Sequence, residues 1–283
     1  MTAIAPARGL VDDAGLFPPT ALPMDAAVAR HRADVRRAHP MLTNRFLCPA
    51  SRIGELADVL GPGDQVRVGL ICDTGIDGLP VALDAVAEDL RLVLAVIEFP
   101  LAKAGTAGGE AALDAVLART PAGIPLFAEP VALGDVDALA AAVATRGDDR
   151  LVGLKARCGG VRAELFPSPE ALAHFIYAVS SARVPMKATA GLHRAVRYHD
   201  PQTGFAHHGF LNILAAVVRA VAGDGEDAVT AALREEEPAV LTGVLDMAGE
   251  VALTEARAVF TSYGSCSTSR PLEEAAALGL RAG

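Results

Sequence analysis

The chain has 283 residues, of which 52% are hydrophobic and 21% charged, and a composition this apolar predicts a folded protein with a large core. Its formal net charge of −9, with no cluster of Lys and Arg among aromatic residues, argues against a nucleic-acid partner or binding to an anionic membrane surface. Four scattered cysteines without a C-x-x-C pair, no signal-type N-terminus and no apolar run approaching about 18 residues together predict a cytoplasmic protein without a membrane span.

Short apolar segments alternate along the chain with longer Ala-rich segments whose apolar residues follow helical spacing. Nearly continuous apolar strands joined by helices indicate a parallel sheet that is covered on both faces. The number of strands, and the absence of a G-x-G-x-x-G motif after an early strand, favour a barrel over an open, doubly wound sheet. We therefore predict an α/β fold: a single (β/α)8 TIM-type barrel domain over residues 1–283. The eight predicted strands are residues 9–13, 42–48, 66–73, 91–99, 124–129, 151–157, 184–190 and 258–264.

One connection is much longer than the others. About 65 residues separate the seventh and eighth predicted strands, and they include the turn-like sequence HDPQTG. We predict an insertion at about 192–257 with two or three helices. Long connections of this kind in compact domains are usually lids or binding loops. An alternative is a decorative or oligomer-forming segment, so a homo-oligomer is possible.

Ionisable residues stand near the ends of the predicted strands, where barrels of this type place their active sites. Such groups are rarely buried unless they are paired or functional. We therefore expect carboxylates and cations to converge at one mouth of the barrel. The catalytic candidates are Asp73, Glu98, Glu129, Lys155 and Lys187. The candidates for substrate binding are Asp13, Arg45, Arg157, Thr189, Gly191, His193, Gly264, Ser265 and Ser267.

The chain contains 22 arginines but only three lysines, and Lys103, Lys155 and Lys187 each fall at or just after a predicted strand. A desolvated lysine can lose its proton and attack a carbonyl group to form a Schiff base, which a guanidinium cannot do. Lys155 and Lys187 lie on consecutive strands, so we expect each ammonium group to lower the pKa of the other. The alternative is that both are structural ion-pair partners of Glu98 and Glu129.

Two lysine motifs, GLKARCGG at 153–160 and MKATAGLHRA at 186–195, resemble those of the deoxyribose-phosphate aldolase family of class I aldolases. VIEFPLAK at 96–103 resembles that family's fourth strand, and FTSYGSCS at 260–267 resembles its phosphate-binding last strand. The resemblance implies that Lys155 forms the Schiff base and that Lys187 acts as its electrostatic neighbour. It also implies that Gly191, Gly264 and Ser265 form an anion site.

The chain departs from this pattern at strand four and in the long insertion. Val96 stands where the family has a carboxylate, so Glu98 would have to take that role from what we expect to be the opposite face of the strand, and the insertion has no counterpart in the family. We predict a lyase without a cofactor that acts on a small, possibly phosphorylated carbonyl compound. Lys155 or Lys187 would form the imine, one of the candidate carboxylates would move protons, and the 192–210 loop with His193 would close over the substrate.

Three other functions are open at this point. His193, His207 and His208 together with the strand-end carboxylates could bind a metal ion in a lyase or hydrolase, although H-E-x-x-H spacing is absent. The small residues in GSCSTSRPLEE, followed by a helix, would suit a phosphate-binding isomerase or transferase. A non-catalytic binding barrel is the third. Cys266 is a weaker nucleophile candidate, because no histidine is fixed beside it in the sequence.

Overall fold

The computed structural model describes residues 6–106, 108–146, 150–201 and 203–280. Eight strands, all parallel, close into a barrel in the order β1-β10-β7-β6-β5-β4-β3-β2. The predicted (β/α)8 barrel is therefore confirmed, and each predicted strand overlaps an observed one. The barrel strands are β1 (Val11–Asp13), β2 (Leu42–Pro49), β3 (Val66–Ile71), β4 (Leu92–Pro100), β5 (Leu126–Glu129), β6 (Val152–Arg157), β7 (Met186–Thr189) and β10 (Phe260–Ser265).

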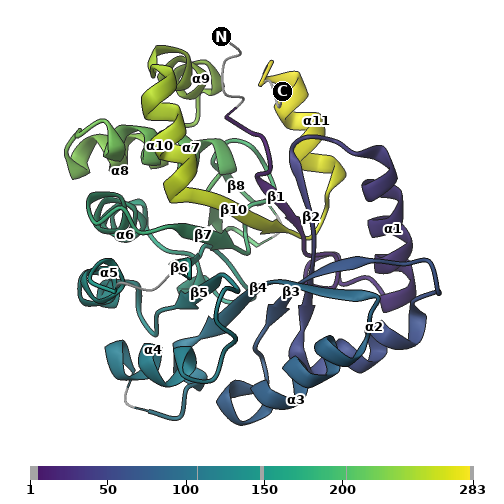
Figure 1. Ribbon diagram of the computed structural model, residues 1–283. Coiled ribbons are helices and arrows are strands. Elements are labelled where there is room, and N and C mark those ends of the chain that lie inside the picture. Colours follow the sequence, from purple (N-terminus) through teal and green to yellow (C-terminus); the bar gives the residue numbers. More distant parts are fainter. Residues whose placement is uncertain (1–5, 107, 147–149, 202, 281–283) are drawn as a thin grey trace.

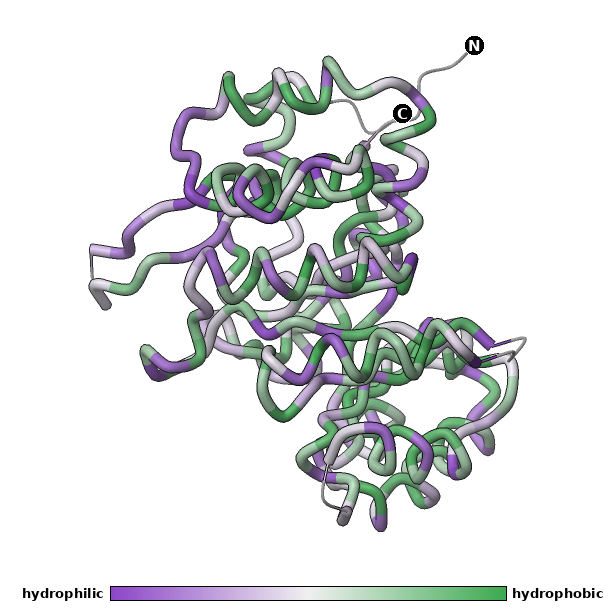
Figure 2. Tube along the Cα trace, turned by 90° about the vertical axis from the view of Figure 1, so that its left-hand side faces the viewer, coloured by the Kyte–Doolittle hydropathy of each residue, from purple (hydrophilic) through white to green (hydrophobic). Residues whose placement is uncertain are grey.

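The helices form a ring outside the strands (Figure 1). Hydrophobic and hydrophilic stretches alternate along them (Figure 2), as expected when one side of each helix packs on the barrel and the other meets water. Among the described residues, no helix has the length and hydropathy needed to cross a membrane. The helices between the strands are α1 (Met24–Arg37), α2 (Ile53–Val59), α3 (Gly75–Glu88), α4 (Gly109–Leu117), α5 (Val136–Ala144) and α6 (Pro169–Ser181), and α11 (Ser269–Ala277) follows the last strand.

The long connection between β7 and β10 contains a small hairpin and a group of helices. The hairpin pairs β8 (Tyr198–His199) with β9 (Ala206–His207) in antiparallel fashion. Four helices follow, so the expectation of two or three was too low. Among these four helices, α7 is the most buried and packs against α6, α8 and α10, because its sequence FLNILAAVVRAV is apolar on nearly every side. The four are α7 (Phe210–Val221), α8 (Glu226–Arg234), α9 (Pro238–Met247) and α10 (Glu250–Val259).

Glycine makes room for large side chains inside the barrel. A Cβ atom at Gly153 on β6 would lie 2.5 Å from the backbone oxygen of Pro185 and 2.6 Å from Cε1 of Phe127. The Phe127 ring in turn lies below Lys187, whose Nζ is 5.7 Å from the ring centroid. A small residue in β6 therefore allows an aromatic layer to support the charged groups above it.

This packing predicts opposite effects for two glycine-to-alanine substitutions. Gly153→Ala should lower the free energy of unfolding by about 1–3 kcal/mol, because the added methyl group meets backbone and a packed ring. Gly54→Ala is the matched control, since Gly54 lies within α2 and its Cβ would have nothing within 4 Å. The control should be stabilising by about 0.5–1 kcal/mol. Urea unfolding of both variants measures the difference, and equal effects would contradict this account of the barrel interior.

Candidate functional site

Seven charged side chains form a continuous chain of ion pairs through the barrel, and we call it the interior ion-pair chain. Positive and negative groups alternate along it, with four cations and three anions. Its first member lies near the N-terminal ends of the strands and its last lies at the opposite mouth. In order, its members are Arg45, Asp12, Lys187, Glu98, Lys155, Glu129 and Arg157.

Glu98 is the central member and joins the two lysines. Its Oε1 lies 2.5 Å from Lys187 Nζ, and its Oε2 lies 3.1 Å from Lys155 Nζ. All three side chains are almost fully buried, with exposed fractions of 3% or less. The expectation that Glu98 lies on the opposite strand face from Val96 is wrong: the two residues are two positions apart, and alternation along a strand puts them on the same inward face. Glu98 is therefore the carboxylate that β4 directs at the lysines.

An arginine stands at each end of the interior ion-pair chain. Lys187 also donates to Asp12 Oδ2 at 2.6 Å, and Arg45 Nε donates to Asp12 Oδ1 at 2.7 Å. At the other end, Lys155 Nζ lies 2.9 Å from Glu129 Oε2, and Arg157 Nε donates to Glu129 Oε1 at 2.9 Å. Every buried carboxylate thus has two cationic partners, which is the condition under which buried charges are tolerated.

Strand register places the two lysines side by side. β6 pairs with β7 so that the Cα atom of Lys155 is opposite that of Lys187. The prediction that the two lysines lie on neighbouring strands and point inward is confirmed. The alternative, in which the two lysines are ion-pair partners of Glu98 and Glu129, also agrees with the structure. Lys155 contacts both carboxylates, and Lys187 contacts Glu98.

The pKa shifts follow from burial and these contacts. Burial alone would lower the pKa of Lys155, but Glu98 and Glu129 outweigh it and raise that pKa above its usual value. The expectation that Lys187 lowers it is therefore wrong. Burial would raise the pKa values of Asp12, Glu98 and Glu129, but the neighbouring cations hold all three below their usual range. Lys155 and these three carboxylates are therefore ionised at neutral pH.

A cavity of about 560 Å³ opens above one part of the interior ion-pair chain. Lys155, Glu98 and Arg157 contribute to its lining, whereas Lys187 does not. Lys155 is therefore the lysine that a molecule in the cavity could reach, and Lys187 lies below it with Phe127. The cavity stands at the C-terminal ends of the strands, where (β/α)8 barrels place their active sites.

Several predicted binding residues also line this cavity: Thr189, Gly191, His193 and Gly264. Gly191 has a positive φ of 72°, and a Cβ there would lie 2.4 Å from the backbone oxygen of Cys158. Only glycine fits this turn without strain. Ser265 and Ser267 do not belong to the lining, and the Ser265 hydroxyl donates to the backbone oxygen of Ser267 at 2.7 Å.

Three predicted site residues lie elsewhere. Asp13 points away from the barrel interior and binds Arg30 and His31 of α1, because alternation places Asp12 and Asp13 on opposite faces. Arg45 enters the interior from the N-terminal side, where it also lines an open groove, so it cannot contact a molecule in the cavity.

Asp73 is likewise separate from the cavity lining. Its carboxylate accepts hydrogen bonds from the backbone nitrogen and the hydroxyl of Ser51, at 3.0 and 2.5 Å. Lys103 donates to the backbone oxygen of Asp73. These contacts connect the ends of β2, β3 and β4, and they give Asp73 a structural role at the rim.

The histidines proposed as metal ligands do not converge. His207 Nδ1 lies 2.9 Å from the backbone oxygen of Gly191, while His208 Nε2 lies 2.9 Å from that of Pro167. Burial lowers the pKa of His193 and His207, and it lowers that of His208 to about 4. In the described part of the chain, no three His, Cys, Asp or Glu side chains are grouped as a metal site requires.

Sequence reasoning missed two features of the site. Asp12 and Ser262 belong to the buried network, in which the Ser262 hydroxyl donates to Asp12 Oδ2 at 2.9 Å. Cys266 lies beside His193, with 3.6 Å between Sγ and Nδ1, although 73 residues separate them. Both side chains line the cavity. Strand parity could have pointed to Asp12 once the register was known, but no local signal pairs Cys266 with His193.

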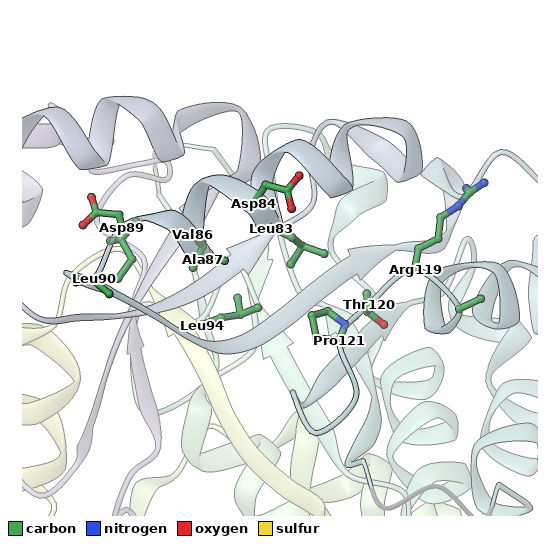
Figure 3. A pocket seen from close by; sticks show the side chains of 12 residues that line it. Leu83, Asp84, Val86, Ala87, Asp89, Leu90, Leu94, Arg119, Thr120 and Pro121 are labelled. Carbon is green, nitrogen blue, oxygen red and sulfur yellow. The ribbon is translucent and has the colours of Figure 1, made fainter.

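A second depression, of about 600 Å³, lies between α3 and the end of α4 (Figure 3). It stands near the start of β4, away from the C-terminal mouth, and it contains none of the interior ion-pair chain. Of its charged groups, Asp84 extends from α3 and Arg119 from the turn after α4 (Figure 3). The cavity above Lys155 is therefore the candidate active site.

No protein-family model matches the chain, and no curated protein shows significant sequence similarity to it. The resemblance to deoxyribose-phosphate aldolases thus stays a prediction. The shared features visible in the structure are the barrel and two lysines on neighbouring strands, and a barrel by itself supports many unrelated chemistries.

The buried carboxylates predict how stability depends on pH. Their pKa values are depressed in the folded state, so the ion pairs contribute fully above about pH 5. This contribution is lost as the pH falls from about 4 toward the depressed values. We expect the free energy of unfolding in urea to decline over this range, and Glu98→Gln should reduce the decline. Glu55→Gln, at an exposed pair with Arg52 that water screens, is the control and should reduce the decline much less than Glu98→Gln does.

Proposed function

We propose that the protein is an aldolase-like lyase that forms a Schiff base between Lys155 and a small carbonyl substrate. The observation that supports this most directly is the position of Lys155, whose amine lies at the floor of the cavity between two carboxylates. A nucleophilic lysine needs access to substrate, a nearby acceptor for its proton and a site that excludes water. The cavity offers the first two, and a substrate that fills it would displace its water.

Proton transfer within the interior ion-pair chain would activate Lys155. In the resting site the ammonium group is stabilised by Glu98 and Glu129, and its pKa is raised. A substrate that fills the cavity displaces water and increases the cost of keeping two charges there. Moving the proton from Lys155 to Glu98 or Glu129 removes one positive and one negative charge together. Substrate binding thus favours the neutral amine that the reaction requires.

The chemical step balances with these groups. The neutral amine attacks the carbonyl carbon, and the resulting carbinolamine loses water when the protonated carboxylic acid donates to its hydroxyl group. An iminium forms and the carboxylate is regenerated. This carboxylate removes the proton from the hydroxyl group on the β carbon, the bond between the α and β carbons breaks, and its electron pair moves toward the iminium to give an enamine while the β fragment leaves as a carbonyl compound. The carboxylic acid then protonates the enamine, and hydrolysis of the resulting iminium frees Lys155.

Lys187 has a positioning role in this scheme. It holds Oε1 of Glu98 and leaves Oε2 directed at Lys155. Its contacts with Asp12 and Glu98 and its burial keep it out of reach of a molecule in the cavity. Lys187 therefore fixes the carboxylate that exchanges a proton with Lys155.

A second candidate is an isomerase that moves a proton without covalent chemistry. The raised pKa of Lys155 supports it, because a permanently protonated lysine can polarise a carbonyl oxygen while Glu98 removes a proton from the adjacent carbon. The two candidates use the same residues, and they differ in whether a bond forms at Lys155 Nζ.

Borohydride trapping distinguishes them. The protein is incubated with a panel of aldehydes and ketones and reduced, and the adducts are located by intact mass and peptide mapping. We expect one adduct, on Lys155, that is lost in Lys155→Arg. Lys103→Arg is the control, because Lys103 is bound at the rim to the backbone oxygen of Asp73.

Lys187→Met should reduce the trapping rate on Lys155 by about tenfold or more, because Glu98 would lose the partner that orients it. An adduct on Lys103 alone, or equal labelling in Lys155→Arg, would refute the imine. Isomerisation of a carbonyl substrate that persists in the absence of any trapped adduct would instead support the second candidate.

A further inference from the structure

We propose that the substrate of this site carries an apolar, aryl-sized group that the upper part of the cavity binds, and that it carries no phosphate. This inference deepens the proposed function and depends on it for the carbonyl group that would meet Lys155. It departs from the phosphorylated substrate that the sequence motifs suggest, and it comes from the walls of the cavity.

The walls above Lys155 are mainly apolar. They come from separate parts of the protein: the segment after β1, strand β2, the segment after β6 and the β8–β9 hairpin. We call this part of the cavity the apolar upper pocket. Its principal side chains are Phe17, Leu47, Val161, Leu165, Phe166 and Phe205.

Aromatic contacts tie the two segments of the roof together. The ring centroids of Phe166 and Phe205 lie 4.9 Å apart, and those of Phe166 and His207 lie 4.7 Å apart in an edge-to-face arrangement. Tyr198 stacks on the other side of His207 at 4.8 Å. Such rings form a surface that favours contact with another flat apolar group.

The charges around the pocket do not suit a phosphate. Arg157 and Lys155 are the cations of the described lining, and Glu129 contacts both of them. His193 and His207 are neutral near pH 7 because burial lowers their pKa values. Glu98 also lines the cavity and contacts Lys155, so carboxylates already occupy both cations of the described lining.

The other cations near the mouth are exposed and have partners. Arg194 lies over the ring of Tyr198, with its guanidinium carbon 4.2 Å from the ring centroid. Arg270 pairs with Glu274 on α11. The hydroxyl of Ser265, expected at an anion site, is bound to the backbone oxygen of Ser267. No cluster of donors in the described residues is thus aimed into the cavity as phosphate recognition requires.

The volume of the cavity also favours a ligand with an apolar, aryl-sized group. About 560 Å³ falls within the range of pockets that hold drug-sized ligands. A carbonyl compound of three or four carbons would leave most of the apolar upper pocket filled with water. An added aryl group would displace that water and bury the surrounding side chains.

Carbonyl-free compounds test the pocket separately from the chemistry. Titration calorimetry with 3-phenylpropan-1-ol, propan-1-ol and propyl phosphate measures binding without imine formation. We expect the phenyl compound to bind about tenfold or more tightly than propan-1-ol, since the ring buries additional apolar area. Propyl phosphate should neither bind measurably nor displace the phenyl compound.

A matched pair of variants locates the binding. Val161→Asp places a carboxylate at the lip of the pocket, and Val81→Asp places one on α3, where the side chain is 72% exposed compared with 79% at Val161. Val161→Asp should weaken binding of 3-phenylpropan-1-ol about fivefold or more, because it puts a charge against an apolar ligand. Val81→Asp should leave binding unchanged. Equal effects of the two variants would overturn the inference.

Trapping rates separate this inference from the proposed function. We expect borohydride to trap 3-phenylpropanal on Lys155 about tenfold or more faster than propanal or glyceraldehyde 3-phosphate at equal low concentration. Faster trapping of the phosphorylated aldehyde would overturn the apolar specificity and leave the Schiff base intact. Tight binding of 3-phenylpropan-1-ol that depends on Val161, with no adduct from any aldehyde, would refute the Schiff base and leave the apolar pocket supported.

Discussion

The interior ion-pair chain is the constraint on which the rest of the site depends. A barrel of this size is commonly filled by apolar side chains, which would cost less than buried charges. Because replacing a buried ion pair with apolar residues is often neutral or stabilising, stability alone does not explain seven charged groups in the interior. Their arrangement has a chemical consequence at the cavity floor, where Lys155 meets Glu98 and Glu129. This is the physical reason to prefer a catalytic barrel over a non-catalytic scaffold.

The interior ion-pair chain has one more cation than anions, so the loss of one proton would make it electrically neutral. With four cations and three anions, loss of a single proton leaves three of each. Lys155 is the lysine that lines the cavity, whereas Lys187 is enclosed by Asp12, Glu98 and the Phe127 ring. The two lysines are adjacent in register but differ in access to the cavity, and this difference is why we propose Lys155 as the nucleophile and Lys187 as its neighbour.

The pattern of apolar segments was enough to predict the barrel, because strands and helices differ in the spacing of their apolar residues and the two kinds of segment alternate along the sequence. The two inward lysines could also be predicted, since they are rare in this chain and stand on consecutive strands. Other site residues depended on information that no local pattern contains. The choice between Asp12 and Asp13 is a matter of strand parity, which an error of one residue in the strand register reverses. The contact between Cys266 and His193 depends on how the β7–β10 connection folds back over the mouth, and the sequence offers no signal for that path.

The apolar upper pocket and the charged groups beneath it affect each other, because the apolar side chains influence how much water reaches the charges. Electrostatic interactions strengthen when water is excluded, and the hairpin with the segment after β6 supplies the surface that excludes it. An apolar group on the substrate would complete that exclusion, because it fills the space that water otherwise occupies above Lys155. A phosphate would bring its own charge and hydration into the same space, next to the carboxylates of Glu98 and Asp200. The features that would make Lys155 a nucleophile are therefore the same ones that select an apolar substrate.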